Sequence, residues 1–96
     1  MDNKHWLILY DIREEKRLVK VASLIESYGY RVQKSVFEAD APEYVIKELI
    51  KRIESIIDIE TDFVLFFEVC ERDWQKKEVF GKDKDLQNND ANFIIL

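Results

Sequence analysis

The residue whose position best suits chemistry is Asp11, the acid that ends an apolar run starting at Trp6. By strand alternation Asp11 shares a face with Leu7 and Leu9. If a second copy covers that face across a two-fold axis, two Asp11 carboxylates approach each other and can hold one Mg²⁺ between them. Water and substrate phosphate oxygens then fill the remaining metal positions. A turn former or a helix cap is the alternative role for an acid at this place.

Basic residues follow Asp11 at distances that suit phosphate contacts. Arg17 and Lys20 share one flank of a predicted helix, and Arg31 begins the next strand. The alternative is a solvated basic flank without a dedicated role. Ser35 has no local base partner and the only histidine, His5, precedes the first strand, so a Ser-His or Cys-His nucleophile is unsupported.

Two aromatic residues lie on the predicted strands beside these charges. Tyr10 and Phe37 could stack on bases, but aromatic residues on strands more often pack in a core or an interface, and we expect Phe37 at an interface. The single cysteine, Cys70, excludes an internal disulfide, and its apolar setting predicts a packed thiol.

The spacing of apolar residues predicts the elements that position these side chains. Strands are expected over 6–11, 31–39 and 63–70, with a short charged edge strand over 77–80. Helices are expected over 14–28 and from Pro42 to Ile57, the second one capped by Asp40. The predicted fold is α+β of the βαββαβ type with both helices on one side of the sheet, although the elements as predicted run strand, helix, strand, helix, strand, strand.

Length, charge and hydropathy limit the classes of function. The chain has 96 residues, enough for one domain. A formal charge of −5 argues against nonspecific coating of nucleic acid, so any contact with nucleic acid must be local. No apolar run is long enough to span a membrane and no signal-like segment opens the chain, which predicts a cytoplasmic protein without a membrane partner.

The apolar pattern also predicts a protein partner. The strand 6–10 is apolar on both faces, and so is 63–67, although helices on one side cover only one face. An identical subunit is the simplest cover for the second face.

The predicted domain, 1–81, is followed by a tail, 82–96. The tail ends in an apolar segment made of Phe93, Ile94, Ile95 and Leu96. This segment is expected to form a strand on an open sheet edge of the same chain, of the dimer partner or of another protein. A frayed end is the alternative.

Together the segments LYDI, EEKRLVKVASLIESYGYR and RVQKSVFEAD resemble the small CRISPR-associated adaptation proteins of the Cas2 family. The resemblance continues more loosely through DFVLFFEV and KKEVFG. It implies a ferredoxin-like homodimer with facing sheets and a tail strand that crosses to the partner. It also implies one Mg²⁺ or Mn²⁺ shared between the two Asp11, with cleavage of single-stranded RNA or double-stranded DNA. The matching positions are Tyr10 and Asp11 at the strand end, Arg17 and Lys20 on the helix, and Arg31, Ser35 and Phe37 on the second strand.

Two functions follow from this resemblance. The first is a metal-dependent endonuclease centred on Asp11. The second is a structural adaptor that bridges the CRISPR integrase during spacer acquisition, with basic residues on duplex DNA and the terminal strand on the partner. The adaptor role is the favoured physiological one, with nuclease activity as a property of the isolated dimer.

Overall fold

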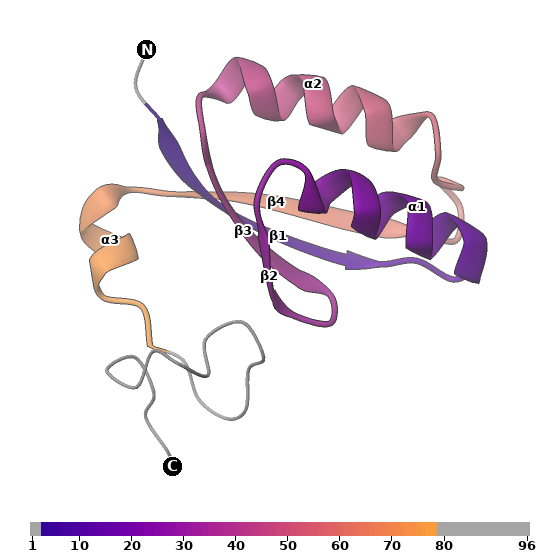
Figure 1. Ribbon diagram of the computed structural model, residues 1–96, viewed down its shortest axis with the longest axis horizontal. Coiled ribbons are helices and arrows are strands. Elements are labelled where there is room, and N and C mark those ends of the chain that lie inside the picture. Colours follow the sequence, from indigo (N-terminus) through magenta and orange to yellow (C-terminus); the bar gives the residue numbers. More distant parts are fainter. Residues whose placement is uncertain (1–2, 79–96) are drawn as a thin grey trace.

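The computed structural model describes residues 3–78, which form one sheet and three helices (Figure 1). The elements are β1 (Lys4–Asp11), α1 (Glu15–Glu26), β2 (Tyr30–Gln33), β3 (Val36–Ala41), α2 (Glu43–Glu54), β4 (Phe63–Val69) and α3 (Glu71–Gln75). The strand order is β2-β3-β1-β4, and all neighbours are antiparallel. This is the ferredoxin-like βαββαβ arrangement, so the predicted fold class is confirmed.

The core lies between the sheet and the pair α1 and α2, which cover the same face (Figure 1). Alternation along β1 places Trp6, Ile8 and Tyr10 in this core, because each is at most 7% exposed. The helices contribute residues at helical spacing: Val21, Ala22 and Ile25 from α1, and Ile46, Leu49 and Ile53 from α2.

A single strand over 31–39 was the wrong prediction, because a two-residue turn at Lys34 and Ser35 divides it into β2 and β3. The turn contains no glycine or asparagine, the usual signals of a tight hairpin. β1 holds it in place: the Tyr10 hydroxyl donates to the Lys34 carbonyl at 3.0 Å, and the Tyr10 amide donates to the Ser35 carbonyl at 3.1 Å. The hairpin supplies the two consecutive strands that the βαββαβ order requires.

The helix boundaries follow local chemistry. α1 begins after Glu14, whose carboxylate accepts the Arg17 amide at 3.1 Å. After α1 the chain turns at Gly29, where a Cβ would lie 2.2 Å from the Glu38 carbonyl oxygen, so a side chain has no room. The prediction that Asp40 caps the second helix is wrong: Asp40 lies in β3, and α2 begins at Glu43 after Pro42.

The end of the described chain differs from the predictions. The short helix α3 was not expected, and Cys70, expected to be packed, is exposed before its first turn. Lys77 and Glu78, which begin the predicted edge strand, are in no strand, and the rest of that segment lies outside the described residues. The expected terminal strand, Phe93, Ile94, Ile95 and Leu96, also lies outside them. Within residues 3–78 no helix has the length and apolar character needed to cross a membrane.

Candidate functional site

The sheet face opposite α1 and α2 carries a continuous apolar surface, as alternation predicted. Antiparallel register places Leu7 of β1 beside Phe67 of β4, and Leu9 beside Leu65. The three β4 side chains on this face are strongly exposed, with Phe63 at 55%, Leu65 at 41% and Phe67 at 58%. We call these five residues the open face. Contiguous exposed apolar surface of this kind marks an interaction site.

Asp11 lies at one end of the open face, opposite Phe63 in the register. It is exposed, and its carboxylate makes no hydrogen bond or ion pair with the other described residues. Within 3–78, no three His, Cys, Asp or Glu side chains gather as a metal site. One chain therefore offers one free carboxylate at this position, which fits a metal ion only if a second copy or the substrate supplies further ligands.

Arg17, which was predicted to contact phosphate, is paired with carboxylates of its own chain. Its Nε donates to the Asp62 carboxylate at 2.8 Å, and a second guanidinium nitrogen lies 3.4 Å from the other carboxylate oxygen. Glu14 lies 3.5 Å from the third nitrogen. The Arg17 side chain is only 27% exposed, so most of its donor capacity is used before any nucleic acid arrives.

Asp62 is the central acceptor at this end of the molecule, and the sequence predictions missed it. Its side chain has no exposed surface and also accepts the backbone amides of Arg13 at 3.0 Å and Asp58 at 2.8 Å. The Arg17 hydrogen bond, helped by these amides, holds the pKa of Asp62 well below its ordinary value. Because Arg13 follows Asp11 by two residues and Asp62 precedes β4, this carboxylate fixes the chain on both sides of Asp11.

Three of the residues predicted to contact nucleic acid lie together in a cavity at a different place from Asp11 and Arg17. Tyr10, Arg31 and Ser35 line one cavity of about 490 Å³ between α1 and the β2–β3 hairpin. The Arg31 guanidinium stands 5.1 Å from the centre of the Phe37 ring, and its Nε is buried without a hydrogen-bond partner in the described part of the chain. Lys20 is exposed on α1 and does not line this cavity.

Burial corrects two of the aromatic predictions. Phe37 is fully buried beneath the helices, so it cannot lie at an interface with another chain. Tyr10 is 4% exposed and its hydroxyl is bonded to the hairpin, so its ring packs in the core and is not free to stack on a base. Tyr10 lies on the predicted strand 6–11 and Phe37 on the predicted strand 31–39, and both side chains face the helices.

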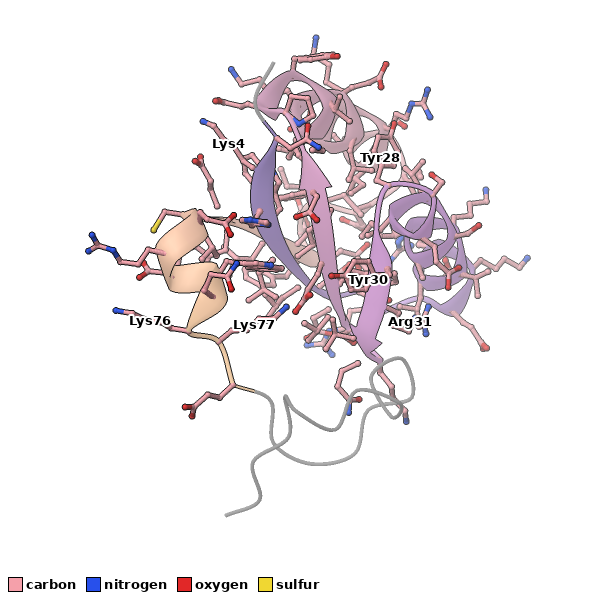
Figure 2. All side chains as sticks on the ribbon, turned by 60° about the vertical axis from the view of Figure 1, so that its left-hand side comes forward. Lys4, Tyr28, Tyr30, Arg31, Lys76 and Lys77 are labelled. Atoms are coloured by element: carbon pink, nitrogen blue, oxygen red, sulfur yellow. The ribbon has the colours of Figure 1, made fainter. Side chains whose placement is uncertain are left out.

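A polar cluster that the sequence did not predict fastens α3 to the sheet. Figure 2 shows α3 beside the sheet with Lys77 at its end, and Tyr30 on the far strand β2. His5 stacks on Trp74 at 4.7 Å between ring centres and contacts Glu71 and Asp40. The contact with Glu71, and more weakly that with Asp40, raises the pKa of His5 against the opposing effect of burial.

Lys77 completes this attachment. Its ammonium lies 2.7 Å from the carboxylate of Glu38, which is only 3% exposed, and 3.9 Å from the centre of the Trp74 ring. The Tyr30 hydroxyl donates to the same carboxylate at 2.9 Å. The charge of Glu38 is thus matched, and α3 covers part of the sheet at the end opposite Asp11.

The fold and site define a small ferredoxin-like protein whose open sheet face ends in a carboxylate without a partner in residues 3–78. The family described as CRISPR associated protein Cas2 matches residues 4–77, and the chain belongs to this family. A Synechocystis relative, "CRISPR-associated endoribonuclease Cas2 2", is 34% identical over 95% of this chain and 97% of its own length. A Thermus thermophilus relative, "CRISPR-associated endonuclease Cas2 2", is 36% identical over 73% of this chain and 78% of its own.

Solved structures agree with this assignment. Streptococcus pyogenes Cas2 has a TM-score of 0.70 at 36% identity, covering 80% of this chain and 99% of that one. A chain of a partial Cas6-RT-Cas1–Cas2 complex has a TM-score of 0.55 at 28% identity, covering 79% and 83%. The resemblance stated from the sequence is therefore confirmed at the level of the family.

Proposed function

We propose that this protein is a homodimeric subunit of CRISPR adaptation that bridges the integrase and binds duplex DNA, and that its dimer cleaves single-stranded RNA or double-stranded DNA with a divalent metal. The observation that carries the proposal is the open face, which is apolar along two strands and ends in the free carboxylate of Asp11. The family, the relatives named as nucleases and the complex named Cas1–Cas2 support it.

A second copy is the occupant that the open face favours. Phe63, Leu65 and Phe67 present apolar surface that would otherwise stay in water, and a two-fold axis would set the same residues of each copy against each other. Asp11 lies at one end of this face, so an axis near that end brings the two carboxylates together. Of the described elements, α3 attaches at the opposite end and leaves this part of the face uncovered.

The residues present fit a shared Mg²⁺ or Mn²⁺ ion, because Asp11 is an oxygen ligand with no partner among the described residues. When bound, such an ion lowers the pKa of a coordinated water and neutralises charge on a phosphate. The chain itself would contribute the two Asp11 carboxylates as ligands. Lys20, exposed on α1, and Arg31 with Ser35 in the cavity would contact the nucleic-acid backbone.

A purely structural adaptor without nuclease activity is the second candidate, and the state of Arg17 favours it. The ion pair with Asp62 withholds from the substrate a cation close to Asp11. The formal charge of −5 for the whole chain also disfavours binding of a phosphate backbone through net charge. In this role the open face and the integrase contact would be sufficient.

A cleavage assay separates the two candidates. Wild type and Asp11→Asn are incubated with labelled single-stranded RNA and duplex DNA over a magnesium titration, with Glu60→Gln as a control that changes another exposed acid. Under the nuclease proposal, the cleavage rate of Asp11→Asn should fall at least about 100-fold, because the charged carboxylate that would coordinate the metal is lost. Glu60→Gln should stay active. Equal cleavage by all three proteins would leave only the adaptor role.

A further inference from the structure

The cavity between α1 and the β2–β3 hairpin has the features of a binding site that neither the open face nor Asp11 explains. Its volume of about 490 Å³ lies within the range of about 300 to 1,000 Å³ typical of small-ligand sites. We propose that it binds one unpaired nucleotide of a nucleic-acid strand. This inference rests on the proposed function for the choice of a nucleotide among phosphate-bearing ligands, and it limits what the cavity itself binds to a nucleotide of single-stranded or locally opened nucleic acid.

One side of the cavity is suited to a phosphate group. The Nε–H of Arg31 is buried and finds no hydrogen-bond partner among residues 3–78, a state that is rare and costly for a charged donor. The contact of Arg31 with the Phe37 ring does not supply an acceptor for this hydrogen. Lys34 and Ser35, in the hairpin turn, add an exposed ammonium and a hydroxyl to the same lining. A phosphate oxygen would satisfy Arg31 and accept from both neighbours.

The α1 side is suited to a base. Leu18, Val19 and Ala22 give it an aliphatic surface, and Val19 is 60% exposed although it lies on a helix that otherwise faces water with polar residues. A free phosphate ion would make no use of this surface, whereas a base would bury it. Glu26 and Ser23 lie on the same lining, where a carboxylate and a hydroxyl can accept hydrogen bonds from amino or imino groups of a base edge.

A base-paired duplex cannot place a base in this cavity. In a duplex the bases are stacked and their hydrogen-bonding edges are occupied, so a base enters a side pocket only when it is unpaired. Tyr10 lines the cavity and precedes Asp11 along β1. Because successive side chains of a strand point to opposite faces, the Asp11 carboxylate lies on the other face of the sheet, and the cavity is a site separate from the proposed metal ligand.

Binding is measured on the full chain by two-dimensional amide NMR, with titrations of adenosine 5′-monophosphate, its deoxy form, adenosine and inorganic phosphate. The expected result is saturable shifts of the Ser23, Arg31 and Ser35 amides with either nucleotide, and several-fold weaker binding of adenosine and of phosphate. Lys34→Gln should raise the dissociation constant about fivefold, as expected for one exposed ionic contact. The matched control is Lys47→Gln, which removes an exposed lysine from α2, outside the cavity, and should bind like wild type.

Absence of saturable shifts at the cavity, or equal effects of the two lysine changes, would overturn the inference. Phosphate that binds as tightly as the nucleotide would also overturn it, because the base would then contribute nothing. The comparison of ribose and deoxyribose distinguishes RNA from DNA as the source of the nucleotide. The same titration on Asp11→Asn separates this inference from the nuclease proposal. If Asp11→Asn binds the nucleotide and the wild-type protein cleaves no nucleic acid, the cavity is supported and the nuclease proposal is refuted.

Discussion

The change Phe67→Glu tests whether the open face is an interface between two copies. Phe67 lies near the middle of β4, opposite Leu7, and is 58% exposed on the side away from the core. An exposed fraction of this size leaves about 110 Å² of apolar surface on a phenylalanine, and its burial is worth about 3 kcal/mol. In a two-fold dimer the residue occurs twice, so about 6 kcal/mol is the upper limit of what the substitution removes.

Part of this energy is recovered by local repacking, and the introduced glutamates face each other across the axis. We therefore expect the dimer dissociation constant to rise at least about 100-fold, equivalent to about 2.7 kcal/mol. The measurement is sedimentation equilibrium over a concentration series on the full chain. Tyr44→Glu is the matched control, because Tyr44 is 61% exposed on α2, on the opposite side of the molecule.

Both variants should keep the wild-type circular dichroism spectrum, since neither side chain lies in the core. An unchanged dissociation constant for Phe67→Glu would refute the assignment of the open face as the dimer interface. A loss of association with both variants would point to an interface on the helical side. Only a selective effect of Phe67→Glu agrees with the proposed dimer.

Two further predictions concern pH. Because the folded-state pKa of Asp62 is depressed, its stabilising effect is complete above the unfolded value of 3.8 and is lost as the pH falls below that value. Chemical denaturation between pH 5 and 2.5 should show a steep loss of the free energy of unfolding for wild type and a flatter profile for Asp62→Asn. Because the folded-state pKa of His5 is raised, its stabilising contribution is complete below 6.5 and is lost as the pH rises through the folded value. In a Trp6→Phe background, Trp74 fluorescence should therefore report loosening of α3 as the pH rises above 6.5, and adding His5→Gln should remove this transition. A pH-independent signal from the Trp6→Phe protein would contradict the coupling.

Features that depend on local periodicity were accessible from the sequence. The alternation of β1 separates Trp6 and Ile8 from Leu7 and Leu9, and the two faces have the environments that this pattern predicts. The hairpin turn was missed because Lys34 and Ser35 interrupt no alternation and carry no turn signal. The same error placed Phe37 on the wrong side, since its burial depends on how β3 pairs with β1.

Long-range polar pairs were not accessible from the sequence. Arg17 and Asp62 are 45 positions apart, and His5 and Glu71 are 66 apart, so their contacts exist only once β4 lies beside β1. An acid just before an apolar strand, as Asp62 is, gives at most a weak signal. The ion pair of Arg17 with Asp62 shows why a basic residue at a position that matches the family does not by itself establish a contact with nucleic acid.

The adaptor and nuclease roles make different demands on the end of β1. An adaptor needs the apolar face but gains nothing from a fixed carboxylate, whereas a metal site shared between two copies needs Asp11 held in one position. The buried acceptor Asp62 ties down the Arg13 amide and the start of β4, which restricts Asp11 from both sides. It does so at the expense of Arg17, because one guanidinium cannot serve Asp62 and a phosphate equally well. In the proposed nuclease, the position of the metal ligand Asp11 would thus be kept, and substrate charge would be met by Lys20 or by the cavity that contains Arg31.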